Sequence, residues 1–242
     1  MIVFFTVLLL IIVLILLIIN CIKYNNEKYI DRPFDTKLID LEYHKSHGIN
    51  SDNTIPIIES FIKFTKPNIC VCIGTGDGLI PRVLRQSQIN SGKINGKTIL
   101  IDLGETMGAM PDKIHNLNSK FRKIYPDIDV FKGFSVPNGI NYLKNNNIHN
   151  IDILWIDGDH SFEGSLNDFK NYSKLLSNNG FIFMHDTLPN GQNNKQPDWC
   201  GVNKTIQYIH ENYKNEFELI NIVGNKNRKP GTGFAIIKRK QQ

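Results

Sequence analysis

Cysteine is scarce in this sequence, and the few cysteines are not arranged as a disulfide framework. The 242 residues include four cysteines. Cys70 and Cys72 are two positions apart in a segment that we expect to be a strand, so their side chains share a face and cannot easily bridge. Cys21 and Cys200 have no neighbouring cysteine. The sequence therefore indicates a protein of a reducing compartment.

Charged residues are absent from residues 1–22, and residues 1–19 are apolar apart from Thr6. A helix of about 20 apolar residues spans the roughly 30 Å hydrocarbon core of a membrane. A cleaved secretory signal usually has a basic start and a small-residue cleavage site, and this segment has neither. We therefore expect residues 1–22 to be a retained transmembrane anchor.

Basic residues follow this apolar segment but do not precede it. Lys23, Lys28, Arg32 and Lys37 come soon after it. Because basic flanks stay on the cytoplasmic side, we expect a single-pass membrane protein with a cytoplasmic C-terminal domain. Much of the net charge of +5 lies in the C-terminal tail without interleaved aromatic residues, so nucleic acid is not an expected partner.

Beyond the anchor, short apolar runs alternate with segments of helical periodicity, and no internal repeat is visible. Residues 23–50 are interpreted as a polar linker with a short helical region, and residues 51–242 as one domain. The expected strands are residues 68–73, 97–102, 129–132, 152–156, 181–184, 218–223 and 234–238. The expected helices are residues 55–64, 139–146 and 202–213, one that begins near residue 79 and one that ends near residue 125. A further helix is expected from an apolar stripe that runs from Leu166 to Leu176, and Asn179 and Gly180 are expected to end it.

This alternation predicts the α/β class, with a Rossmann-like, doubly wound, mostly parallel sheet. A loop containing glycine and proline, rather than a helix, joins the last two strands, so we expect an antiparallel last strand. Asp102, Asp157 and Asp186 each come at or just after the carboxyl end of an expected strand. Since ligands bind at the carboxyl ends of such sheets, these acids are expected to face one crevice.

Glycines at positions 74, 76 and 78 follow the first expected strand and precede a helix. Glycine lets a backbone turn tightly and approach a ligand closely. Asp102 ends the next strand, where an acid can accept hydrogen bonds from the hydroxyls of a ribose. Together these features favour a cofactor that contains a nucleoside.

The segment LWIDGDHSFEGSLNDFKNYSKLLSNNGFIFMHDT, residues 154–187, resembles the signature of the methyltransferase-24 domain group. The likeness extends over residues 55–238, and the terminal strand pair resembles class I S-adenosylmethionine-dependent methyltransferases. The resemblance implies that fold, S-adenosylmethionine as cofactor and a divalent metal (Mn²⁺, Fe²⁺ or Mg²⁺). It implies the following roles: Gly74, Thr75, Gly76, Asp102, Phe134, Ser135 and Asp157 for the cofactor, Asp157, His185 and Asp186 for the metal, and His160 as the catalytic base.

Two positions depart from the family pattern. Cys72 stands where class I enzymes usually carry an acid, and His185 stands where metal-binding relatives often have a second acid. An imidazole suits Mn²⁺ or Fe²⁺ better than Mg²⁺. Other interpretations of single residues stay open: Asp159 as a helix cap or a brace of its loop, and Asp168 as a surface residue or the partner of a structural hydrogen bond.

The sequence thus predicts a membrane-anchored, metal-assisted O-methyltransferase for a small hydroxylated substrate. One alternative is a membrane-anchored glycosyltransferase in which Asp157-Gly158-Asp159 holds a metal and a sugar nucleotide, with sequons at Asn171 and Asn203. The other alternative is a non-catalytic module that binds S-adenosylmethionine. No pattern in the sequence indicates an oligomeric state.

Overall fold

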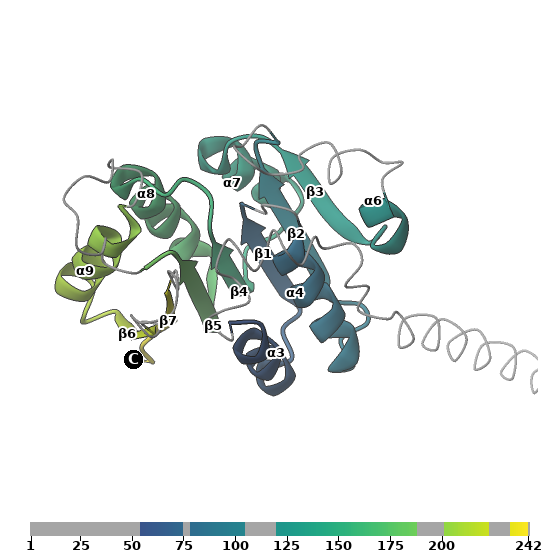
Figure 1. Ribbon diagram of the computed structural model, residues 1–242, viewed down its shortest axis with the longest axis horizontal. Helices are drawn as coiled ribbons and strands as arrows, with labels where there is room; N and C mark the ends of the chain where they lie inside the picture. The colour runs from purple at the N-terminus through teal and green to yellow at the C-terminus, as the bar shows by residue number, and fades with distance from the viewer. Residues whose placement is uncertain (1–53, 75–77, 105–119, 188–200, 223–232, 242) are drawn as a thin grey trace, which may run out of the picture. The chain divides into compact units, whose positions relative to one another are not determined.

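The computed structural model describes residues 54–74, 78–104, 120–187, 201–222 and 233–241, all of which belong to one compact unit (Figure 1). The expected anchor, residues 1–22, and the linker, residues 23–50, lie outside the described residues. Within the described ranges, no helix combines the length and the apolar character needed to cross a membrane.

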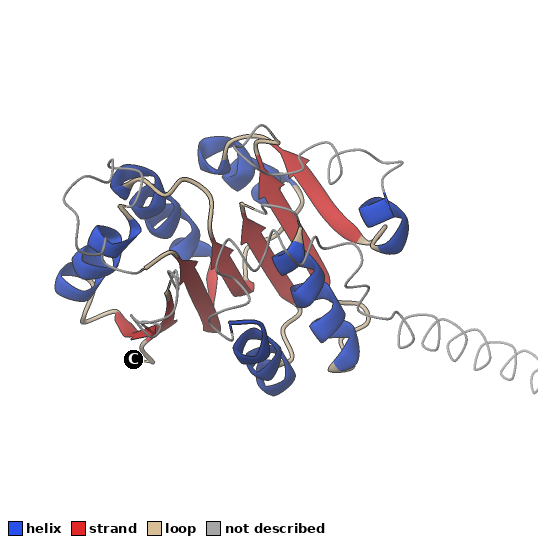
Figure 2. Cartoon of the chain, in the orientation of Figure 1, coloured by secondary structure: helices blue, strands red, loops and turns tan. Residues whose placement is uncertain are grey.

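A seven-stranded sheet forms the centre of the described part of the chain (Figure 2). The strands are β1 (Ile69–Ile73), β2 (Lys97–Asp102), β3 (Ile128–Lys132), β4 (Ile151–Ile156), β5 (Leu176–His185), β6 (Phe217–Ile222) and β7 (Phe234–Arg239). Their order is β3-β2-β1-β4-β5-β7-β6, and only β7 runs antiparallel to its neighbours. This confirms the Rossmann-like, mostly parallel sheet and the antiparallel last strand.

Helices cover both faces of this sheet (Figure 1). They are α3 (Thr54–Thr65), α4 (Leu79–Asn90), α6 (Lys120–Ile124), α7 (Ile140–Asn145), α8 (Phe162–Tyr172) and α9 (Val202–Asn212), with short turns η2 (Ser135–Gly139) and η3 (Ser173–Leu175). Alternate residues of a central strand point to opposite faces, so β1 places Val71 and Ile73 in the core with α7, α8 and α9. Cys70 and Cys72 lie in the core with α3 and α4, and a strand buried on both faces has to be continuously apolar.

The helix after β4 ends earlier than the apolar stripe predicts. Helix α8 ends at Tyr172, and Leu176 is the first residue of β5, where it pairs with Ile151. The prediction was wrong because Leu176 of β5 is buried in the same core as the apolar side chains of α8. The apolar pattern therefore does not show where the helix ends and the strand begins. Gly180 does not end a helix but allows a close approach, since a Cβ atom there would lie 2.7 Å from the carbonyl oxygen of Ile151.

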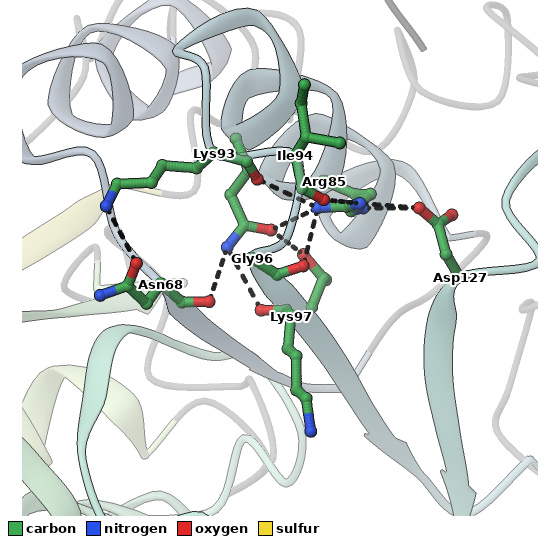
Figure 3. Close-up of polar contacts among 9 residues, drawn as sticks. Asn68, Arg85, Lys93, Ile94, Gly96, Lys97 and Asp127 are labelled. Carbon is green, nitrogen blue, oxygen red and sulfur yellow. Dashed lines mark hydrogen bonds and ion pairs between the residues drawn. The ribbon is translucent and has the colours of Figure 1, made fainter. Parts of the chain in front are cut away.

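A polar network around Arg85 of α4 ties together the amino ends of the parallel strands (Figure 3). Arg85 donates from Nε to Asp127 just before β3 at 2.9 Å, from Nη1 to the carbonyl of Gly96 at 2.8 Å, and from Nη2 to the carbonyl of Ile94 at 2.7 Å. These bonds satisfy carbonyls of the loop between α4 and β2. Figure 3 also shows the contact of Lys93 with Asn68, at 3.0 Å and in an exposed position.

Gln88, one turn after Arg85, completes the same network. Its buried amide donates to the carbonyls of Asn68 and Lys97 at 3.2 and 3.3 Å, and its Oε1 accepts from Thr98 at 2.8 Å. A buried polar side chain is tolerated only when its donors and acceptors are paired. The amino end of the sheet is therefore held by side chains of α4.

We predict that Arg85→Ala lowers the free energy of unfolding by about 3–5 kcal/mol, because it removes the buried guanidinium that pairs with Asp127 and donates to two loop carbonyls. Urea denaturation of the purified protein measures this change. Lys93→Ala is the matched control, since its exposed contact with Asn68 contributes much less. Equal losses in the two variants would contradict the proposed role of Arg85.

Candidate active site

The carboxyl ends of three adjacent strands carry the residues of the candidate site. Gly74 follows β1, Asp157 follows β4, and β5 ends in His185 with Asp186 directly after it. Because β1, β4 and β5 are parallel neighbours, these residues meet at one place. Asp186 has a backbone φ of 57°, in the left-handed region, which Asp adopts more readily than most residues and which is frequent at functional sites.

Asp157, His160, His185 and Asp186 form a cluster that we call the His–Asp cluster. The two nitrogens of His160 lie 3.2 Å from a carboxylate oxygen of Asp157 and 3.2 Å from one of Asp186. Nδ1 of His185 lies 3.3 Å from the same oxygen of Asp157 and 3.4 Å from Asp186. Each imidazole therefore bridges the two carboxylates.

Electrostatics within the cluster favour positive charge between the carboxylates. Burial lowers the pKa of His160, but its hydrogen bond to Asp157 and the charges of Asp157 and Asp186 raise that pKa to about 9. Burial likewise opposes the charged form of His185, yet Asp157 and Asp186 hold its pKa well above the usual value. Burial tends to raise the pKa of Asp157, and the two histidines lower it. Both shifts favour the protonated imidazolium forms, whose positive charge compensates the two neighbouring acids.

The donor atoms of the cluster fit a divalent metal. One donor atom each from Asp157, His160 and Asp186 lies within 4.8 Å of the others. The sequence assigned the third ligand to His185 instead. Its side chain is 4% exposed, against 30% for His160, and its ring lies 5.6 Å from the ring of Trp155. His160, the more exposed of the two histidines, therefore belongs to the candidate metal-binding group. That His185 is a ligand stays a prediction.

Backbone contacts fix the loop that carries His160. Gly201 donates its N–H to the carbonyl of His160 at 2.7 Å, and a Cβ atom at Gly201 would lie 2.0 Å from the nitrogen of Phe162. A Cβ atom at Gly74, where φ is +74°, would lie 2.0 Å from the carbonyl oxygen of Asp157. The loops after β1 and β4 and the start of α9 thus approach one another so closely that only glycine fits at these positions.

Asp159 braces this loop and does not cap the helix. Its carboxylate accepts the N–H of Ser161 at 2.9 Å, and Ser161 is the residue that caps α8, accepting from Gly164 at 3.0 Å. Of the two interpretations of Asp159, the helix cap is wrong and the brace is confirmed. Asp159 is not part of the metal-binding group found among the described residues, which weakens the glycosyltransferase interpretation of Asp157-Gly158-Asp159.

Residues 71–187 match the sequence model of a family described as a methyltransferase domain, the methyltransferase-24 group. The match spans 117 of the 242 residues, slightly less than half of the chain. The chain thus contains a methyltransferase domain, and its sheet order agrees with class I of these enzymes. A comparison with curated protein sequences gives no significant match.

Solved structures of methyltransferases share the fold. An O-methyltransferase from Bacillus cereus in complex with SAH is 16% identical, with a TM-score of 0.63, and the match covers 87% of this chain and 93% of that one. The O-methyltransferase TomG from Streptomyces achromogenes, involved in tomaymycin synthesis and in complex with SAM, is 14% identical, with a TM-score of 0.59 and coverage of 78% and 80%. A putative caffeoyl-CoA O-methyltransferase from Staphylococcus aureus is 14% identical, with a TM-score of 0.57 and coverage of 83% and 92%.

Among the expected cofactor residues, Gly74, Asp102, Phe134 and Ser135 lie at or just after the carboxyl ends of β1, β2 and β3, and Asp157 follows β4. Thr75 and Gly76 lie outside the described residues. Asp102 ends β2, and one of its carboxylate oxygens accepts the N–H of Gly104 at 2.6 Å. Phe134 follows β3 with 63% of its side chain exposed. Cys72, which replaces the usual acid, is buried with α3 and α4; burial raises the pKa of its thiol, which donates to the carbonyl of Gly74 at 3.1 Å.

Asp168 of the methyltransferase is a buried acid, for which the sequence allowed either a surface position or a structural hydrogen bond. Its side chain is 2% exposed, and it accepts a hydrogen bond from the hydroxyl of Ser135 at 2.5 Å. Burial raises the pKa of Asp168 to about 6, against the opposing effect of this hydrogen bond. The surface interpretation was wrong and the structural hydrogen bond is confirmed. The available signal was its position beside the buried stripe of Ser165, Phe169 and Tyr172 on α8.

Proposed function

We propose that this methyltransferase transfers a methyl group from S-adenosylmethionine to a hydroxyl of a small molecule, with help from a divalent metal. The observation that carries the proposal is the His–Asp cluster, which lies at the carboxyl ends of β4 and β5, where ligands of open α/β sheets bind. The O-methyltransferases of similar fold that hold SAM or SAH support the cofactor and the type of acceptor.

In this proposal, the loops after β1, β2 and β3 bind the cofactor. Gly74 allows the chain after β1 to approach Asp157 so closely that a Cβ atom would lie 2.0 Å from its carbonyl oxygen, and Thr75 and Gly76 follow Gly74 in the sequence. Asp102 accepts hydrogen bonds from the ribose, and Phe134 offers an exposed ring next to Ser135 for the adenine. S-adenosylmethionine would supply the activated methyl group, while these residues fix its position.

Asp157 and Asp186 would hold the metal, together with His160 or His185. A divalent ion held there would orient an acceptor hydroxyl and would lower its pKa. The oxygen and nitrogen donors suit Mn²⁺ or Fe²⁺ better than Mg²⁺. The chain contributes two carboxylates whose charge favours a positive partner, as the raised pKa values of His160 and His185 indicate.

His160 is the proposed base, and its environment sets the condition under which it can act. Both of its nitrogens contact carboxylates, and its pKa of about 9 keeps it protonated at neutral pH. If Asp157 and Asp186 shared their charge with a bound cation, His160 would lose the main cause of its raised pKa. The neutral imidazole of His160 could then accept the proton of the hydroxyl.

A non-catalytic module that binds S-adenosylmethionine is the second candidate function. It is favoured by the two departures at Cys72 and His185, which replace acids of the family pattern. Methyl transfer to any acceptor distinguishes the two, because a module without turnover would bind the cofactor and release it unchanged.

We predict that the purified full-length chain binds S-adenosylmethionine and that Asp102→Ala weakens this binding about 10-fold or more, because lost hydrogen bonds to a ribose cost about 1–3 kcal/mol. Isothermal titration calorimetry measures both affinities. Asp129→Ala, which removes an exposed carboxylate from β3, is the matched control and should bind as the wild type does. If the wild-type chain fails to bind the cofactor, the proposed function is wrong.

We predict that His160→Gln lowers turnover on a hydroxylated acceptor by about 10²–10⁴ while cofactor affinity stays within a few-fold. The assay follows labelled methyl groups onto a panel of catechols and hydroxylated sugars. Excess chelator should also abolish transfer, and Mn²⁺ should restore it.

Calorimetry with Mn²⁺ separates a base from a ligand in the same variants. If His160 is the base, His160→Gln binds Mn²⁺ as the wild type does, whereas Asp186→Ala loses this binding. A loss of Mn²⁺ affinity in His160→Gln would make His160 a ligand and overturn its assignment as the base. Unchanged turnover would remove it from catalysis altogether.

We further propose that residues 1–22 anchor the methyltransferase in a membrane with its domain in the cytoplasm, on the strength of the apolar segment and the basic residues after it. The full-length chain should stay in the membrane fraction at high salt, and its domain should be digested when protease is added to intact microsomes. A protected domain would place it in the lumen and contradict the orientation.

A further inference from the structure

The hydroxyl of Ser135 has its only proton committed to a partner inside the protein. Ser135 Oγ donates to Oδ1 of Asp168 at 2.5 Å, across 33 positions of the sequence. Asp168 accepts this proton with its carboxyl oxygen, although burial raises the pKa of the carboxyl group to about 6. A serine hydroxyl has one donor and two acceptor positions. The oxygen of Ser135 can therefore offer only its acceptor positions to a ligand.

Helix α8 holds Ser135 at a second point as well. Tyr172, one turn after Asp168, donates its hydroxyl to the carbonyl of Ser135 at 2.8 Å. A Cβ atom on Gly139 would lie 2.5 Å from that same hydroxyl, so η2 packs tightly against α8. The backbone and the side chain of Ser135 are thus both fixed by α8, which pre-organises the hydroxyl.

Asp168 also lies beside the loop after β4. Its Oδ2 is 3.7 Å from the position that a Cβ atom of Gly158 would occupy. Asp168 therefore lies between the loop after β3, which carries Phe134 and Ser135, and the loop that carries the His–Asp cluster. Among the described residues, Asp168 accepts its hydrogen bond from Ser135, so Ser135 is the route by which this carboxylate acts on a ligand.

We propose that Asp168 is a positioning residue that turns the Ser135 hydroxyl into an obligate hydrogen-bond acceptor and thereby selects the amino group of adenine in the cofactor. The inference rests on the proposed function, which places the adenine near Phe134 and Ser135. The exocyclic amine of adenine is a donor and matches such an acceptor, whereas the 6-oxo group of hypoxanthine is an acceptor and does not. A site that pairs one polar group in this way rejects the analogue that lacks it.

The test compares S-adenosylhomocysteine with S-inosylhomocysteine by calorimetry on the full-length chain. We expect the wild type to prefer the adenosyl compound about 10-fold or more. Asp168→Ala should reduce this preference to about 3-fold or less, because Ser135 can then also donate to the 6-oxo group. Asp168→Asn should retain the preference, since its carbonyl still accepts the serine proton.

Asp152→Ala is the control for a purely structural loss. Asp152 accepts from the N–H groups of Asn68 and Ile69 and from Ser177, at the amino end of the sheet. Its removal should lower stability and leave the adenine preference unchanged. If Asp168→Ala does not fold, Ser135→Ala tests the inference instead. This variant should also lose the preference for the adenosyl compound.

An unchanged preference in Asp168→Ala or Ser135→Ala would overturn the inference while leaving the proposed function intact. A wild-type chain that binds neither compound would remove the proposed function and this inference together. Loss of preference in Asp152→Ala would show that general destabilisation, and not Asp168, sets the selectivity.

Discussion

The proximity of two carboxylates, Asp157 and Asp186, is the constraint on which the candidate site depends. Parallel pairing of β4 and β5 places both acids at one edge, and the left-handed backbone at Asp186 turns its side chain into the site. Two like charges at this distance need a positive partner, because burial removes the water that would screen them. The raised pKa values of His160 and His185 favour protonated imidazoles as that partner. A divalent cation would meet the same requirement, and the donor atoms of Asp157, His160 and Asp186 lie close enough together to hold one.

Close backbone packing keeps this arrangement rigid. The loop after β4, which carries Asp157 and His160, is in close backbone contact with Gly74 at Asp157 and with Gly201 at Phe162. A reacting group has to be held to within a fraction of an ångström to be effective, and backbone contacts hold loops more firmly than flexible side chains do. The glycines of this site are therefore required for contact as much as for conformation.

The sequence allowed the sheet and the location of the site to be predicted, because both follow from short-range patterns. Apolar runs mark the strands, and Asp102, Asp157 and Asp186 mark their carboxyl ends. What could not be predicted depends on contacts between distant segments. Leu176 satisfies the core as part of a helix or of a strand, and only its pairing with Ile151 decides between them. The burial of Asp168 becomes visible only when α8 meets Ser135 of η2.

The amino ends of the parallel strands stabilise the fold, whereas their carboxyl ends carry the candidate site. At the amino ends, Arg85 and Gln88 have their donors engaged by carbonyls and by Asp127, so that end stabilises the fold and offers little to a ligand. At the carboxyl ends, Ser135 and the exposed Phe134 follow β3, and two acids of like charge, Asp157 and Asp186, follow β4 and β5. Such groups are costly for a folded chain alone and are compensated when a ligand supplies the missing partners. This asymmetry follows from parallel strands, which gather all their carboxyl ends on one side and leave the other side to the connections that close the fold.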